Sequence, residues 1–356
     1  MRNETRVAFA ALTKQIAQVN GVPSATVKFN VTPSVQQTLE SIIQESSELL
    51  KQINVIGVIE QEGEALLLGV NGPIASRTNT TAGNPRKPAN VAELSKDSYH
   101  CKQTNFDTAF PYPLLDAWAK FKDFQVRLTN SIAERQALDR IMIGFHGVKV
   151  EKATDRDAYP MLQDVNIGWL QKIRATANDR VLDEGATTGK ITVGAVKVIK
   201  VAGVETEIKG DYQTLDGLVY DAIQMLDPWH RSRPDLVVMI SRNLMHEKLL
   251  KAVERGAASN VEENAAQEIT SRARVGGLPV VDAPFFPDGT VLVTFTKNLS
   301  IYYQEGARRR HVKDEPEMDR IADYQSSNDA YVIEDFGAVA LVENIEPMEY
   351  PAPTEA

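Results

Sequence analysis

The sequence predicts a mixed α+β protein with an elongated body. Three observations lead to this prediction. A helical pattern without interruption covers residues 114–144, a long polar loop lies between predicted strands within roughly 60–112, and helix and strand patterns alternate over roughly 155–300. The chain has 356 residues with 43% hydrophobic and 24% charged content, which is ordinary for a globular protein and long enough for two domains.

Charge is unevenly distributed along the chain. The net charge is −9, yet the first 30 residues carry four basic side chains against one acidic one, and residues 314–356 carry twelve acidic side chains against one basic one. Phosphate affinity depends on clustered Lys and Arg, so this balance disfavours nucleic-acid binding by the whole chain. We interpret the acidic end as a solvated face and a tail.

Compartment signals are few. No apolar run approaches the roughly 18 residues of a membrane span, and the first 30 residues lack the features of a secretory signal, so no membrane partner is expected. Cys101 is the only cysteine, so the chain cannot form an intramolecular disulfide. That fits a reducing compartment.

The N-terminal part predicts two helices. Residues 5–19 have apolar side chains at helical spacing, and Asn20-Gly21-Val22-Pro23 ends this pattern. Such a basic, separable segment could be a tail, a scaffold-like element or a removable propeptide. A second helix is predicted over Ser34–Gln52, opened by Pro33.

A long polar loop follows. Strands are predicted at Val55–Ile59 and Glu64–Val70, and residues 71–107 are then rich in Gly, Pro, Asn and Thr. Loops beyond roughly 12–15 residues are usually functional or disordered, and the flanking strands argue against simple disorder. We therefore predict an arm that reaches onto another chain. Its candidate intersubunit contacts are Arg77, Arg86 and Lys87.

The strongest helical pattern lies at 114–144. Its apolar residues at 3.6-residue spacing are Leu115, Trp118, Phe121, Leu128, Ile132, Leu138 and Ile141. At ~1.5 Å per residue such a helix would span roughly 45 Å. Because the apolar stripe does not keep a 3.5-residue period, we expect the spine of an elongated domain and not a coiled coil.

Helix and strand patterns alternate in the following part. A helix is predicted over Tyr212–Leu226, a strand covered on both faces over Asp235–Ile240, and a helix capped by Ser241 after it. Further β structure is predicted at Pro279–Phe285, Thr290–Phe295, Leu299–Tyr303 and Tyr331–Glu343, with a turn at Asp288-Gly289.

Residues Gly185–Lys190 resemble a phosphate-binding loop but fail its requirements. Three residues separate Gly185 from Gly189 where the Walker pattern needs four, and Ile191 stands where a hydroxyl should bind magnesium. Asp183 and Glu184 directly before the loop would repel phosphate. We predict that Asp183–Gly189 is an exposed turn that enters a strand.

Other catalytic patterns fail as well. The five histidines are scattered without metal-ligand spacing, and the acids at 155, 157 and 164 lack the glycine and final glutamate of a calcium loop. No G-x-S-x-G pattern is present. The sequence therefore predicts no catalytic, cofactor-binding or metal site, and a protein that is not an enzyme.

A run of basic residues near the C-terminal end invites a nucleic-acid interpretation. Arg308, Arg309 and Arg310 are followed by Asp314, Glu315 and Glu317. With acids so close, charge pairing between strands or between subunits is favoured, so these six residues are further candidate intersubunit contacts.

Seven stretches in a fixed order carry a family resemblance. They are 1-MRNETR-6, 32-TPSVQQTL-39 with 44-QESSELL-50, 116-DAWAKFKDFQVRL-128, 161-MLQDVNIGWLQKIR-174, 234-PDLVVMISRNL-244 and 298-NLSIYYQEGARRR-310. Over nearly its whole length the chain resembles the major capsid proteins of peduovirus-type tailed phages, which have the Hong Kong 97-type capsid fold. The specificity lies in the number and order of the matches.

The resemblance implies a division of the chain. The implied parts are an N-terminal leader (1–30), an N-arm (31–59), an extended loop (60–112), the spine helix and peripheral domain (113–154), an α/β axial domain (155–300), a returning β segment of the peripheral domain (301–345) and an acidic tail (346–356). The leader would be removed on maturation, and the change in composition near Pro33 places the expected cleavage close to Phe29 and Asn30.

The resemblance also implies a function. We expect a structural protein that self-assembles into pentamers and hexamers of an icosahedral phage head, built in the host bacterial cytoplasm and present in the virion. Its implied partners are copies of itself, a phage scaffold and maturation protease, a portal protein, and packaged double-stranded DNA that it would bind without sequence specificity.

Two alternatives remain. An encapsulin-like compartment shell would share the fold, but the basic leader and the phage-type stretches argue against it. A nucleotide or nucleic-acid enzyme would use Gly185–Lys190 or Arg308–Arg310, and the failed loop spacing argues against that function.

Overall fold

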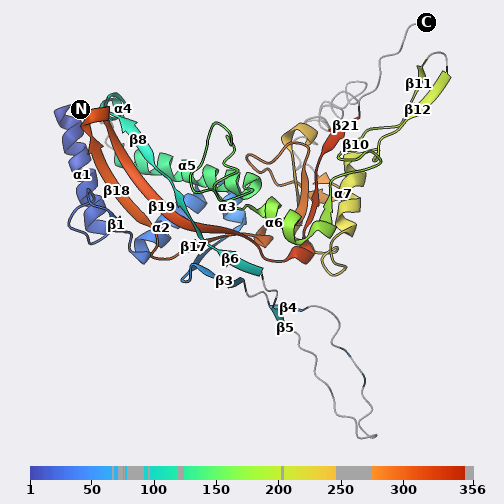
Figure 1. Cartoon of the computed structure of the whole chain (residues 1–356), viewed down its shortest axis with the longest axis horizontal. Coiled ribbons are helices and arrows are strands. Elements are labelled where there is room, and N and C mark those ends of the chain that lie inside the picture. Colours follow the sequence, from blue (N-terminus) through green and yellow to red (C-terminus); the bar gives the residue numbers. More distant parts are fainter. Residues whose placement is uncertain are drawn as a thin grey trace, which may run out of the picture.

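The computed structural model describes residues 1–65, 68–70, 75, 77, 92–94, 97–118, 124–201, 204–245 and 274–348. These residues form an elongated body with a sheet and its helices at each end (Figure 1). We call the end with the N-terminus the peripheral half and the other end the axial half. In the described residues no helix is long and apolar enough to span a membrane.

A seven-stranded sheet organises the peripheral half. Its path is β1 (Phe29–Asn30), β18 (Arg309–Glu315), β19 (Arg320–Ile333), β17 (Leu299–Gln304) and β2 (Asn54–Val58), and β7 (Lys102–Asn105) and β8 (Thr108–Pro111) also pair with β19. Of the pairs, β17 and β2 are parallel, with Ile301 opposite Val55, and the others are antiparallel.

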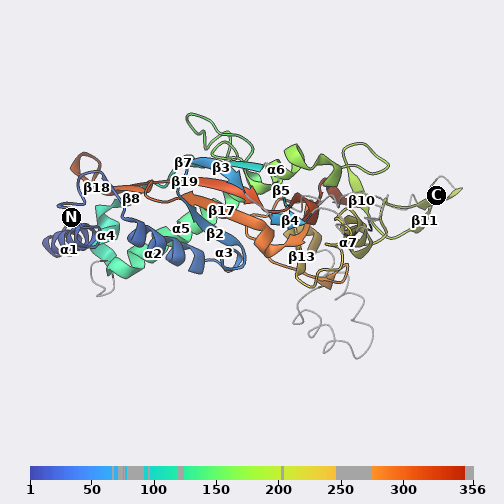
Figure 2. The same cartoon turned by 90° about the horizontal axis from the view of Figure 1, so that it is seen from below.

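Helices cover one face of the peripheral sheet and lie below its strands in Figure 2. They are α1 (Asn3–Val19), α2 (Pro33–Glu45), α3 (Glu48–Gln52), α4 (Tyr112–Trp118) and α5 (Phe124–His146). The single helix predicted over Ser34–Gln52 is wrong, because the backbone at Ser47 is extended and α3 begins anew after it. The predicted spine consists of α4 and α5, and residues 119–123 between them lie outside the described residues.

A buried tryptophan joins the two halves. Trp169 begins α6 (Trp169–Thr176), is fully buried, and packs edge-on against Phe145 and Tyr331. Its indole Nε1 donates a hydrogen bond of 3.0 Å to the carbonyl of Ser300. A Cβ at Gly144 of α5 would stand 2.3 Å from the Trp169 ring, so only glycine permits this approach of α5 to α6.

The axial half is built on a four-stranded sheet. Its order is β13 (Leu236–Ile240), β16 (Val291–Phe295), β20 (Ala340–Val342) and β9 (Val181–Leu182), and β20 pairs in parallel with β9. The helix α7 (Leu215–Gln224) packs on it with a wholly apolar buried face. Strand β21 (Ile345–Pro347) pairs in parallel with β10 (Ile191–Val193).

The strand pairs of β20 and β21 correct one predicted boundary. The returning β segment was expected to stay in the peripheral domain as far as residue 345, but β20 lies between β16 and β9. The chain therefore crosses back into the axial sheet after β19. The predicted strand Pro279–Phe285 is also wrong: β15 (Leu278–Pro279) pairs with β14 (Arg274–Val275), and Phe285 has a positive φ of 58°.

Two-stranded ladders project from the body. Strand β3 (Glu62–Ala65) pairs with β6 (Asp97–His100) and β4 (Leu68–Val70) with β5 (Ala92–Leu94), below the body in Figure 1. They form the described base of the predicted extended loop. Strands β11 (Lys197–Val201) and β12 (Val204–Ile208) form a hairpin at the far end of the axial half. Short 3-10 turns lie at Asn178–Arg180 (η2), Thr296–Asn298 (η3), Pro316–Met318 (η4) and Phe336–Ala338 (η5).

Candidate functional site

The N-terminal helix α1 is packed onto the peripheral half. Ile16 and Ala17 are buried in one apolar cluster with Leu128, Ile132 and Ile321, which come from α5 and β19. The apolar stripe that predicted this helix is therefore the face that it buries.

Polar contacts fix the beginning of α1. The backbone N–H of Arg2 donates to Asp116 Oδ1 at 2.9 Å, and the Thr5 hydroxyl donates to the same oxygen. The hydrogen bond from Thr5, followed by the one from Arg2, holds the pKa of Asp116 below its ordinary value. The basic N-terminal segment thus rests against a carboxylate of α4.

The connection from α1 to the sheet follows the edge of β18. The backbone N–H of Val312 donates to the carbonyl of Ala25 at 3.0 Å, and Ala25 is buried. His311 Nε2 lies 3.0 Å from the carbonyl of Thr26. The segment therefore approaches the sheet already in contact with β18.

The two predicted processing residues form the edge strand β1. Phe29 lies opposite Arg310 and Asn30 opposite Arg309, and the N–H of Val31 donates to the carbonyl of Arg308 at 2.9 Å. The side chain of Phe29 is 9% exposed and that of Asn30 is exposed. The bond between them thus lies in extended, paired backbone at the border of the sheet.

A buried ionic cluster lies between the helices α2 and α5 and the strands β18 and β19. It consists of Glu40 of α2, Arg140 of α5, Arg308 before β18 and Asp329 of β19, and each is 1–3% exposed. Arg140 NH2 donates to Glu40 Oε1 at 3.1 Å and its Nε to Asp329 Oδ2 at 3.0 Å, while Arg308 NH1 donates to Glu40 Oε1 at 2.8 Å. Two cations face two anions, which is the condition for burying such charges.

Neutral amides complete this cluster. Arg308 NH2 also donates to Gln136 Oε1 at 2.6 Å and to Gln325 Oε1 at 3.1 Å. Arg308 was predicted to face another subunit. That prediction is wrong for this residue, because its guanidinium is 1% exposed and bonds within its own chain.

Electrostatics stabilise the ionised states of Glu40 and Arg140, whereas burial lowers the pKa of Arg308. Burial raises the pKa of Glu40, but the charges of Arg140 and Arg308 outweigh it, so its pKa lies below the ordinary value. The carboxylates of Asp329 and Glu40 raise the pKa of Arg140 against the effect of burial. Sequence patterns contain no signal for this cluster beyond polar residues near the apolar stripes of the predicted helices.

The other predicted contact residues lie along the β18–β19 hairpin. Arg310 forms an ion pair with Asp323 at 2.7 Å, and Glu315 accepts from Arg320 at 2.8 Å. Interstrand pairing is therefore present, although with partners on β19 and not with the nearby acids that the sequence suggested.

Exposed members of the set lie outside these pairs. Arg309, Asp314 and Glu317 are exposed, and the Tyr112 hydroxyl donates to Asp314. Arg77 is exposed. The other two predicted contacts of the extended loop, at 86 and 87, lie outside the described residues.

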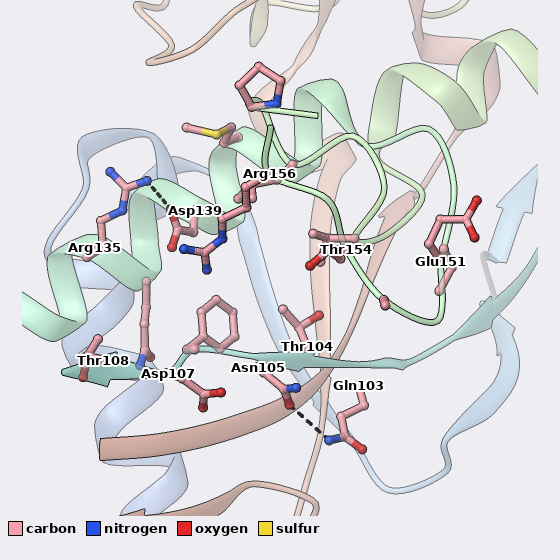
Figure 3. A pocket seen from close by; sticks show the side chains of 18 of the residues that line it. Gln103, Thr104, Asn105, Asp107, Thr108, Arg135, Asp139, Glu151, Thr154 and Arg156 are labelled. Atoms are coloured by element: carbon pink, nitrogen blue, oxygen red, sulfur yellow. Dashed lines mark hydrogen bonds and ion pairs between the residues drawn. The ribbon is translucent and has the colours of Figure 1, made fainter. Parts of the chain in front are cut away.

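A described hollow lies elsewhere. A groove of about 510 Å³ is bordered by β7, by α5 and by the loop that follows α5 (Figure 3). Its charged groups are mixed in sign, and Arg135 and Asp139 pair across one turn of α5. None of the predicted contact or processing residues lines it.

The turn at Gly185–Lys190 enters strand β10, as predicted. The N–H of Ala186 donates to Asp211 Oδ1 at 2.7 Å, and that of Thr192 to Asp211 Oδ2 at 2.8 Å. Lys190 Nζ lies 2.7 Å from Glu346. A carboxylate of the chain itself therefore occupies the place where a phosphate-binding loop would hold its anion.

Candidate reactive groups are few. Burial raises the pKa of the Cys101 thiol to about 12, which keeps it protonated and unreactive at neutral pH. Within the described residues, no group of three or more His, Cys, Asp or Glu side chains is arranged to hold a metal ion.

Comparisons with known proteins agree with one another. The sequence model described as "Phage major capsid protein, P2 family" matches residues 8–345. A protein of Escherichia phage P2 described as "Capsid proteins" is 43% identical over 364 residues, with 100% of this chain and 98% of the relative covered. The "Major capsid protein" of Serratia phage KSP20 is 41% identical over 350 residues, with 97% of each chain covered.

A solved structure is similar over the same length. It is described as "Satellite phage P4 procapsid including size determination (Sid) protein". The match has a TM-score of 0.78 and 41% identity, and it covers 99% of this chain and 100% of that chain.

Proposed function

The chain belongs to the P2 family of phage major capsid proteins, and from this premise we propose that it assembles into pentamers and hexamers of an icosahedral head around double-stranded DNA. The predicted capsid fold and the predicted function as a major capsid protein are confirmed by the full-length relatives and by the procapsid match. The observation that supports the proposed shell most strongly is this match over 99% of the chain.

The proposal includes the sites of assembly and the partners. Subunits would assemble in the host bacterial cytoplasm with a scaffold protein, a maturation protease and a portal protein. The DNA would be enclosed without sequence-specific contacts, which agrees with a chain of net charge −9. Head-to-tail contacts whose rotation closes would produce the rings.

Maturation would remove the N-terminal segment near Phe29 and Asn30. Support comes from their position: β1 is an edge strand, bonded on one side only, at the border between the packed α1 segment and the ionic cluster around Glu40. The paired residues of β1 can leave the edge without disturbing the four other strands of that path. The cluster then holds α2 in place after the cut.

The shell proposal is tested by expressing the chain alone and with its neighbouring phage genes. Negative-stain microscopy and size-exclusion chromatography should show closed shells or five- and six-membered rings. A stable monomer under both conditions would contradict the proposal.

Intact-mass analysis of mature particles tests the cleavage. We expect a subunit that lacks about the first 29 residues. A mass equal to that of the full chain would disprove the removal of the N-terminal segment while leaving shell formation in place.

A further inference from the structure

One face of strand β18 presents basic side chains. Arg310 and Val312 point toward β19 partners and the α1 cluster, so Arg309, His311 and Lys313 alternate onto the opposite face. These three line a groove of about 410 Å³, and Arg310 also borders it, together with Lys28 before β1 and the amides Gln103 and Asn105 of β7. We call it the basic groove.

The groove lacks enough anions of its own. Among the described residues, Lys28 and Arg309 have no carboxylate partner, and Lys313 reaches Glu315 only at 3.5 Å. Asp107 is the carboxylate in the described lining, and its Oδ1 accepts a hydrogen bond from the Gln325 N–H. The lining holds four basic side chains, Lys28, Arg309, Arg310 and Lys313, against the single carboxylate of Asp107, so it would attract an anionic group.

The same hairpin carries unpaired acids at its tip. Glu317 and Asp319 lie in and after η4, are exposed, and have no cationic partner among the described residues. Asp314 is exposed beside them and accepts from the Tyr112 hydroxyl. We call Asp314, Glu317 and Asp319 the acidic tip.

The Arg309 end of the groove lies too far from Glu317 and Asp319 of the tip for these charges to neutralise each other within one subunit. Strand β18 separates Arg309 from the tip, and at ~3.3 Å per residue its seven residues span about 20 Å. Exposed charges so far apart are largely screened at physiological salt. The groove of one copy can be neutralised by the tip of a second copy, because the distance within one subunit does not separate them.

We propose that the basic groove of one subunit receives the acidic tip of a second copy, an inference that rests on the proposed shell function. The contact is head-to-tail, because the two surfaces are different, and a repeated contact of this kind can close around an axis. The carboxylates would lie over Arg309 and Lys313, and the amides of Gln103 and Asn105 would donate to them.

Phosphate is the less suitable anion for this groove. Nucleic-acid binding needs a longer cationic stripe, and the acidic tip on the same hairpin together with the net charge of −9 would repel a duplex. An acidic turn of a second copy brings few charges, which matches the few cations available.

A charge exchange tests the proposal. Because Lys28 is removed if the chain is cut after Phe29, the groove variant is Arg309→Glu with Lys313→Glu, and the tip variant is Glu317→Lys with Asp319→Lys. All four positions are exposed, so both proteins should fold, which circular dichroism will verify. The matched control is Lys209→Glu at an exposed axial position.

Each variant alone should lower the yield of shells at least tenfold. A single chain that carries all four substitutions should restore the yield, because the exchanged charges again attract each other. The Lys209 control should assemble like the wild type. Normal assembly of both variants, or a failure of the combined chain to recover, would overturn the contact while wild-type shells uphold the proposed function. A groove variant that assembles normally but encloses less DNA would also overturn it in favour of nucleic-acid binding. If the wild type itself makes no shells, the proposed function fails and the contact fails with it.

Discussion

The two halves of the molecule hold their cores together in different ways. The interior of the axial half is apolar throughout its main cluster, where α7 and strands β13, β16 and β20 pack Leu, Val, Ile and Ala against one another. The peripheral half buries two arginines and two carboxylates with amides around them. Apolar packing tolerates small shifts, whereas ion pairs require one geometry, so the peripheral half specifies which segments meet.

The difference follows the order of the chain. Glu40 and Arg308 are 268 residues apart in sequence, and Arg140 and Asp329 are 189 apart. The peripheral half is thus assembled from three remote parts of the chain, namely α2, α5 and the β18–β19 hairpin, and the ionic cluster is the place where they meet.

The largest expected effect comes from breaking that cluster. Arg140→Ala would leave the carboxylates of Glu40 and Asp329 buried without their shared cation, so we expect a loss of about 4 kcal/mol in the free energy of unfolding. Urea unfolding of the unassembled chain measures it. The control Arg135→Ala removes a pair in which Arg135 is exposed and Asp139 is half-buried, and it should cost less, about 1 kcal/mol. Equal losses in the two variants would contradict the distinction.

A cavity in the axial core should have a slightly smaller effect. Leu218→Ala removes a fully buried side chain of α7, and we expect a loss of about 3 kcal/mol. The same urea titration applies. Adding salt sharpens the comparison between the halves. The loss in the free energy of unfolding caused by Leu218→Ala should not change with salt, because the contacts that it removes are apolar. A loss below about 1 kcal/mol would mean that the axial core collapses around the cavity.

The smallest expected effect is a dependence on pH. The pKa of Glu40 is lowered in the folded chain, so its ionisation stabilises the fold above the unfolded value near 4.5, and this contribution is lost as the pH falls through the folded value. Urea midpoints should therefore fall on acidification below about pH 4.5, and less steeply in Glu40→Gln. Parallel curves for the two proteins would show that the cluster does not titrate in this range.

Much of the fold was predictable because its signals are local. The apolar stripes of α1 and α7 and the strand at Leu236–Ile240 lie where the sequence patterns placed them. The phosphate loop was rejected on spacing, and Asp211 supplies the physical reason. Family resemblance supplied the overall arrangement.

What could not be predicted depends on remote contacts. A run of three arginines reads as one charged surface, yet Arg308 points inward, Arg310 pairs with β19, and Arg309 faces the basic groove. Strand alternation separates neighbours in this way, but only the sheet register reveals which side is buried. The return of β20 to the axial sheet was missed for the same reason, since its partners β16 and β9 are distant in sequence.

Strand β19 has a mechanical consequence. It is 14 residues long, follows the long direction of the body beside α5, and pairs with β17, β18, β7 and β8. Tension along this direction in a stretched wall would act on the covalent backbone of β19 and would shear its hydrogen bonds together. Because the antiparallel bonds are perpendicular to the strand, many must yield at once, so the subunit should resist pulling along its length far better than peeling at the β1 edge.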